Sequence, residues 1–172
     1  MNAPSLTMAA AVAACLLVPG CDREPLSGPP NLRLGRDECA ECGMLINEDR
    51  CAAGLVVETP PGSGRRAHLL YDDIGCLLDA ELNRAAEFTI IERYFRDHAE
   101  RTWVRAESAA CVIAPPDKLP TPMGSGMVGF ASTDAADSAA SAAGGARTDY
   151  AGLLETRRRW WAQRRLESTQ RR

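Results

Sequence analysis

Aromatic residues are scarce in this sequence, at 5% of 172 residues, and positive charge gathers only at its C-terminal end. Residues 154–172 hold seven Arg and two Glu, a formal charge of +5, whereas the whole chain carries −3 and the rest therefore −8. Nucleic-acid binders place basic residues among aromatics along one face, a pattern that this chain lacks. We therefore expect no nucleic-acid partner, and we interpret residues 154–172 as a solvated, partly disordered basic tail.

Patterns typical of common enzymes are also missing. The sequence contains no Ser/His/Asp arrangement, no P-loop and no dinucleotide-binding fingerprint. His68 and His98 are the only histidines, and each is expected to be structural or solvated rather than a ligand. We accordingly predict that the protein is not an enzyme.

The N-terminus resembles an export signal. Residues 8–18 (MAAAVAACLLV) form an apolar run that is too short to span a bilayer. Residues 17–21 (LVPGC) then match a lipobox, in which the thiol of Cys21 accepts a diacylglyceryl group. We predict a lipoprotein signal peptide over residues 1–20 and a membrane-anchored protein that faces the periplasm; an ordinary cleaved signal peptide is the alternative.

The mature chain divides into four parts by pattern. Residues 21–36, rich in Pro and Gly, are expected to be a flexible tether. Residues 37–98 read as strand, strand, helix, strand: 51–58, 67–71, a helix from about 74 capped by Asp72 or Asp73, and 88–95.

Residues 99–153 repeat that order. Candidate strands are 102–104 and 109–113, then 127–131, a helix capped by Ser132 or Thr133 and ended by Gly144-Gly145, and a last strand in 146–153. The sequence thus predicts an α+β protein of two similar ββαβ units, followed by the tail.

Residues 39–44 (CAECGM) carry the most informative chemistry. Cys39 and Cys42 can converge on one metal ion, and Gly43 lets Met44 turn toward the same point. Thiolate and thioether sulfur are soft ligands that select Cu(I), whereas zinc sites use cysteine, histidine and carboxylate. The CxxC pair also permits a second interpretation, a thiol–disulfide protein that uses Cys39 and Cys42.

Residues 122–127 (PMGSGM) form a second glycine-rich loop with two methionines. Met123 and Met127 could meet the first loop around one ion, or they could fill gaps in the core. Cys76 and Cys111 fall in apolar segments and are interpreted as small buried hydrophobes, while Cys51 is left open.

Taken together, these motifs resemble the NosL family, copper lipoproteins encoded beside nitrous oxide reductase. The matching segments are the lipobox with Cys21, residues 39–44 (CAECGM), 71–78 (YDDIGCLL), 103–109 (WVRAESA) and 121–132 (TPMGSGMVGFAS). The resemblance implies a duplicated ββαβ fold, related in shape to a domain of organomercurial lyase. It also implies a Cu(I) carrier that supplies nitrous oxide reductase or another copper enzyme, with a membrane transporter as a possible further partner.

By the same resemblance, Cys42, Met44 and Met123 are the expected ligands, with Cys39, Met127 and the histidines as weaker candidates. His98 departs from the family pattern, which has an aromatic residue after the aspartate. An organomercurial-processing enzyme is a third hypothesis, and it rests on fold analogy alone.

Overall fold

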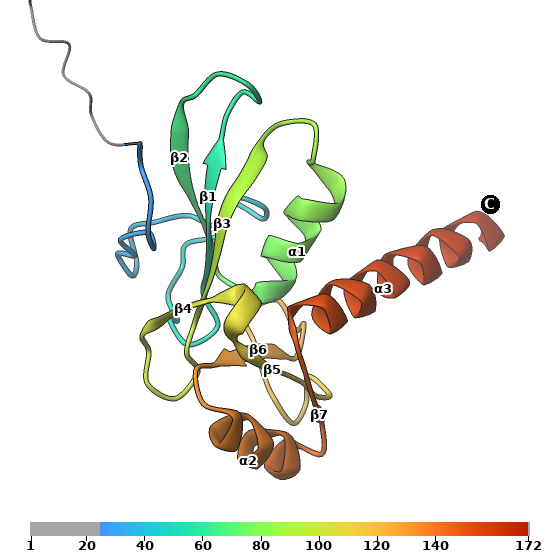
Figure 1. The fold of residues 1–172 in the computed structure, drawn as a ribbon. Helices are drawn as coiled ribbons and strands as arrows, with labels where there is room; N and C mark the ends of the chain where they lie inside the picture. Colours follow the sequence, from blue (N-terminus) through green and yellow to red (C-terminus); the bar gives the residue numbers. More distant parts are fainter. Residues whose placement is uncertain (1–24, 172) are drawn as a thin grey trace, which may run out of the picture.

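Two antiparallel sheets, each covered by a helix, form the body of the protein, and a long helix ends the chain (Figure 1). The structure is a computed structural model that describes residues 25–171. The predicted signal peptide and the predicted lipidation site, Cys21, therefore lie outside the described residues. Within residues 25–171, no helix combines the length and the apolar character needed to cross a membrane.

The first sheet has the strand order β2-β1-β3-β4. Its strands are β1 (Ala53–Glu58), β2 (Arg66–Tyr71), β3 (Thr89–Arg96) and β4 (Trp103–Arg105), and every neighbouring pair is antiparallel. Helix α1 (Ile74–Asn83) follows β2 and is buried over its first two turns. The short 3-10 helix η1 (Ala106–Ser108) leads from β4 into the second sheet.

The second sheet has the order β6-β5-β7, again antiparallel throughout. Its elements are β5 (Ala110–Ile113), β6 (Met127–Phe130), α2 (Thr133–Ala143) and β7 (Ala146–Thr148). Helix α2 begins where the Ser132 side chain accepts a hydrogen bond from the amide of Ala135, and it ends at Gly144, which has a φ of 61°. Both boundaries agree with the sequence prediction.

The predicted α+β class is confirmed as a mixture of two antiparallel sheets and helices. In each sheet the first strand of the unit is central, paired with the strand before the helix and the strand after it. An origin by duplication and the likeness to organomercurial lyase stay predictions. One boundary differs: β4, which we expected in the second unit, pairs with β3 through Phe95 and Val104.

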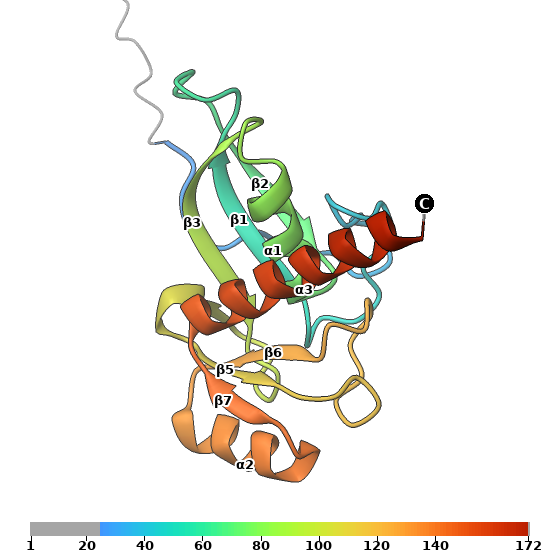
Figure 2. The same ribbon diagram turned by 90° about the vertical axis from the view of Figure 1, so that its right-hand side faces the viewer.

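The basic tail differs most from expectation. Residues 150–153 continue into helix α3 (Tyr150–Gln170), so that β7 is only three residues long. Figure 2 shows α3 running across the molecule beside α1. Leu153 is buried, and the Asp79 carboxylate of α1 accepts hydrogen bonds from the Arg157 guanidinium and from the Trp161 indole, all at 2.6 Å. These contacts hold the first half of α3 against the body.

The described part of the expected tether is also packed against the body. The amide of Gly28 donates to the Glu92 carboxylate at 2.8 Å, and Pro30 is buried against Gly54 of β1. Leu32 packs on the main core. The folded body thus begins before residue 37, where the sequence placed its start.

Candidate metal centre

The CAECGM segment is a tight turn closed by its own backbone. The amide of Cys39 donates to the carbonyl of Met44 at 2.8 Å, and the amide of Gly43 donates back to the carbonyl of Cys39 at 2.9 Å. Gly43 has a φ of 74°, a conformation that L side chains rarely adopt. This return of the chain places both cysteines on one side of the turn.

Strand β2 fixes this turn beside helix α1. The amide of Ala40 donates to the carbonyl of Leu70 at 2.8 Å, one residue before the end of β2. Asp72 and Asp73 follow that strand, and the Asp73 side chain caps α1 by accepting from the amide of Gly75 at 2.6 Å. Cys76 then lies in the first turn of α1, facing the CAECGM turn.

Four side chains converge at this point. The Sγ atoms of Cys39, Cys42 and Cys76 and a carboxylate oxygen of Asp72 all lie within 4.8 Å of one another. Cys39, Asp72 and Cys76 are buried, whereas Cys42 is partly exposed. The Cys42 thiol donates to the Asp72 carboxylate at 3.7 and 3.8 Å. These four residues are called the cysteine–aspartate cluster below.

The thiols of the cluster differ in their acidity. A hydrogen bond from Cys76 is the main cause that lowers the pKa of Cys39 to about 7, and the same bond raises the pKa of Cys76. Burial raises the pKa of Cys42 to about 11. A metal cation replaces such protons, since thiolate is the form that ligates.

The PMGSGM loop is attached to the same end of α1 through Asp73. The Asp73 carboxylate accepts hydrogen bonds from the Thr121 hydroxyl at 2.6 Å and from the backbone amide of Met123 at 3.0 Å. The Thr121 oxygen in turn accepts from the amide of Ser125 at 2.9 Å. Asp73 is completely buried, so that these bonds are shielded from water.

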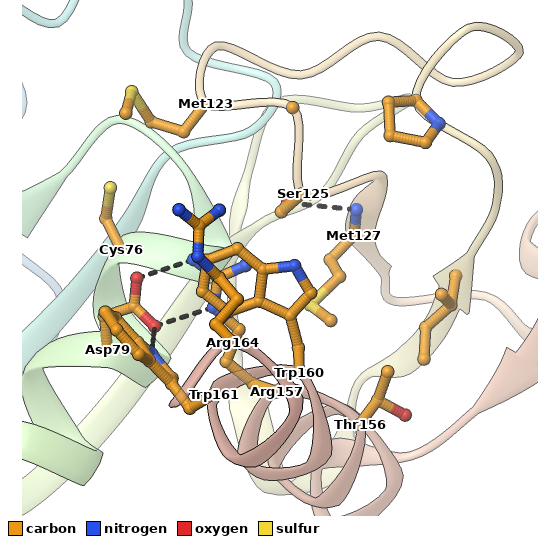
Figure 3. Close-up of a pocket in the computed structure, with 13 residues that line it drawn as sticks. Cys76, Asp79, Met123, Ser125, Met127, Thr156, Arg157, Trp160, Trp161 and Arg164 are labelled. Atoms are coloured by element: carbon orange, nitrogen blue, oxygen red, sulfur yellow. Dashed lines mark hydrogen bonds and ion pairs between the residues drawn. The ribbon is translucent and has the colours of Figure 1, made fainter. Parts of the chain in front are cut away.

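The three methionines that the sequence singled out have different surroundings. Met44 and Met123 are 46% and 44% exposed, which is unusual for thioether side chains. Met44 lines a hollow with Asp72 and Pro122, and Met123 lines a larger pocket with Cys76 (Figure 3). Met127 is 3% exposed within the main core, although it also reaches that pocket.

The remaining thiols and the histidines lie elsewhere. Burial raises the pKa of Cys51 and of Cys111 to about 12 each, and neither joins the cluster. His68 contacts the carbonyl of Gly28 at 2.9 Å, and His98 packs edge-on against Phe130. These placements agree with a structural role for both histidines.

Sequence reasoning missed two members of the cluster. Cys76 was interpreted as a small buried hydrophobe, and Asp72 only as a helix cap. Cys76 is indeed buried in the main core, but its sulfur also lies within 4.8 Å of two other thiols. A usable signal was present, because Asp72 directly follows β2 and Cys76 lies in the first turn of the helix after it, near the end of the sheet where side chains gather.

Comparisons with known proteins identify the family of this chain. The family model described as NosL matches residues 33–156. A solved structure, the copper chaperone NosL from Shewanella denitrificans, is 20% identical, with a TM-score of 0.54 over 70% of this chain and 94% of its own. No curated protein sequence matches the chain. The family match covers well over half of the chain and contains the whole cluster together with both methionine loops, and the chain therefore belongs to the NosL family.

Proposed function

We propose that this protein binds Cu(I) at the cysteine–aspartate cluster and passes the ion to a copper enzyme. The observation that carries the proposal is the convergence of three thiols and one carboxylate within 4.8 Å. Membership of the NosL family and a copper chaperone of the same fold support copper as the cargo.

The donor set favours Cu(I) over Zn(II). Three thiolates and one carboxylate could hold zinc, but the two exposed thioethers beside the cluster have no use in a zinc site. Cu(I) accepts thiolate and thioether sulfur in two- or three-coordinate sites. Met44 and Met123 are then the accessible ligands through which the ion enters and leaves, and the buried thiols retain it.

A thiol–disulfide activity is the second candidate, and the accessibility of the thiols disfavours it. An oxidoreductase needs an exposed thiolate as nucleophile. Here the thiol with the low pKa, Cys39, is 2% exposed, while the accessible Cys42 has a raised pKa of about 11. Turnover of an insulin disulfide by the reduced protein would replace the carrier proposal with this one.

The copper affinity of the reduced protein tests the proposal directly. Cu(I) is titrated in competition with bathocuproine disulfonate, for the wild type and for Cys39→Ser, Cys42→Ser and Cys76→Ser. Each substitution removes a soft ligand, and we expect affinity to fall by about a hundredfold, roughly 2.7 kcal/mol. Cys111→Ser, which removes a buried thiol outside the cluster, serves as the matched control and leaves the affinity unchanged. Equal affinities for all four variants would contradict the site.

The finer assignments extend this proposal. We infer that nitrous oxide reductase receives the copper and that acylated Cys21 anchors the chain on the periplasmic side of the membrane. Deleting the gene in its host and measuring the copper content of nitrous oxide reductase tests the recipient. Membrane fractionation of Cys21→Ser tests the anchor, since the variant is expected in the soluble fraction.

A further inference from the structure

A large cavity adjoins the cysteine–aspartate cluster on the side of helix α3. Its volume is about 690 Å³, within the range of sites that hold small organic ligands. Its walls come from α1, α3 and the PMGSGM loop (Figure 3). Bonds described above fix each wall: Asp79 holds α3, and Asp73 holds the loop.

The lining of this cavity offers two kinds of chemistry. One part is sulfur, from Cys76 of the cluster and from Met123 and Met127. Another part is aromatic and cationic, where the guanidinium carbons of Arg157 and Arg164 lie 4.2 and 4.8 Å from the centre of the Trp160 ring. A ligand that fills the cavity thus meets soft sulfur and a stacked guanidinium together.

Arg164 is the cation that is available to such a ligand. The charge of Arg157 is already used by the Asp79 carboxylate, at 2.6 Å. Within residues 25–171, Arg164 has no carboxylate within ion-pair distance, although most arginines of α3 do. Stacking on Trp160 restrains the guanidinium at the cavity, which lowers the entropy lost when it binds an anion.

We propose that this cavity binds an anionic low-molecular-mass thiol that carries Cu(I), with its carboxylate on Arg164 and its sulfur toward Cys76. This inference rests on the proposed copper function and names the kind of molecule from which the cluster takes its ion. Guanidinium recognises carboxylate through paired hydrogen bonds, and the apolar and thioether walls accept the carbon chain.

The transfer is a ligand exchange without a change of oxidation state. The bond between Cu(I) and the carrier sulfur breaks as a bond to a cluster thiolate forms. The proton displaced from the cluster thiol moves to the departing carrier thiolate. Copper stays Cu(I), and no oxidant or reductant is consumed.

Loading kinetics test the proposal. The full-length, reduced, copper-free protein is mixed with Cu(I)–glutathione, which has carboxylates, or with Cu(I)–2-mercaptoethanol, which has none. We expect saturable loading from the glutathione complex, about tenfold less efficient in Arg164→Gln. The same variant should load at the wild-type rate from the mercaptoethanol complex, because no carboxylate is present to recognise.

Arg165→Gln is the matched control, since it removes the same charge from the adjacent residue, which does not line the cavity. Two results would overturn the cavity proposal. One is an equal decrease of the loading rate in both variants, and the other is a loading rate that rises linearly with the concentration of the Cu(I)–glutathione complex, without saturation. The equilibrium Cu(I) affinity, measured by chelator competition, distinguishes a failure of the cavity proposal from a failure of the proposed function. If affinity is high while loading ignores Arg164, the cavity proposal alone fails; if no Cu(I) is held, the proposed function fails.

Discussion

The carboxylate of Asp73 accepts a hydrogen bond from the backbone amide of Met123, 50 residues further along the chain, at 3.0 Å. The same carboxylate caps α1, the helix that carries Cys76. A single buried side chain therefore sets the position of one thioether loop relative to the thiols. In the proposed copper site Asp73 is therefore a positioning residue rather than a ligand.

A double-mutant cycle measures that positioning. In Asp73→Asn the one remaining side-chain oxygen can still cap α1 at Gly75, and the amide nitrogen then takes the place of Oδ2 and cannot accept from Thr121 or Met123. We expect the Cu(I) affinity of the Met123-containing protein to fall about tenfold. In a Met123→Leu background the same change should cost nothing further, because the thioether is already gone. Asp149→Asn, which alters the N-cap of α3, is the control; additive losses at Asp73 and Met123 would refute the coupling.

The buried carboxylate of Asp97 is expected to make the stability of the fold depend on pH. It is buried at the junction of the two sheets, and although burial opposes ionisation, backbone amides of Ala131, Glu100 and Ala99 hold its pKa below the usual value. Because the folded pKa is depressed, the carboxylate stabilises the fold above about pH 4 and loses this effect as pH falls further.

Urea unfolding at a series of pH values checks this expectation. The wild type should lose stability as the pH falls below about 4. Asp97→Asn should be less stable at pH 7 by about 1–3 kcal/mol and show a flatter acid limb, since its side chain does not titrate. Parallel acid limbs for the two proteins would show that other carboxylates dominate.

The Asp79 contacts predict that α3 detaches when they are removed. Arg157 and Asp79 are 13% and 11% exposed in their side chains, so breaking their ion pair leaves a charge with little access to water. We expect Asp79→Asn to lower the free energy of unfolding by about 2–4 kcal/mol and to expose α3 to trypsin. Glu155→Gln breaks only exposed pairs of α3 and should change stability by less than about 1 kcal/mol.

Gly54 tests whether the N-terminal segment belongs to the folded body. A Cβ at this position would lie 2.5 Å from Cγ of Pro30. Gly54→Ala should therefore destabilise the protein by about 1–3 kcal/mol through overpacking. Adding Pro30→Gly removes the clashing ring and should restore much of the loss, as measured by thermal unfolding. A mobile tether over residues 25–36 would instead make Gly54→Ala harmless.

Local sequence signals predicted the regular elements well. Strands β1 and β2 were expected from short apolar runs, α1 from helical apolar spacing, and the helix ends from caps at Asp73, Ser132 and Gly144. Each of these signals acts within a few residues of the element that it bounds. The residues within and next to each of these elements are therefore enough to predict it.

Features that depend on distant partners were missed. Residues 154–171 look like a solvated tail because the partner that orders them, Asp79, lies 78 residues earlier. Pro30 packs against Gly54 of strand β1, and the Pro/Gly-rich composition of residues 21–36 gives no indication of that contact. Likewise Cys76 joins the cluster only because the turn before β1 folds back onto the end of β2. The spacing of residues does not specify such pairings.

The hydrogen bonds between Asp73 and the PMGSGM loop affect the order in which the proposed site can form during synthesis. The four members of the cluster, residues 39–76, all precede β3, whereas Met123 arrives with the second sheet. A chain that emerges from its N-terminus can gather the thiols early, but it gains the thioether only after Thr121 and Met123 reach Asp73. A molecule made only as far as β3 therefore contains the four cluster residues but lacks Met123, which the proposed copper site uses.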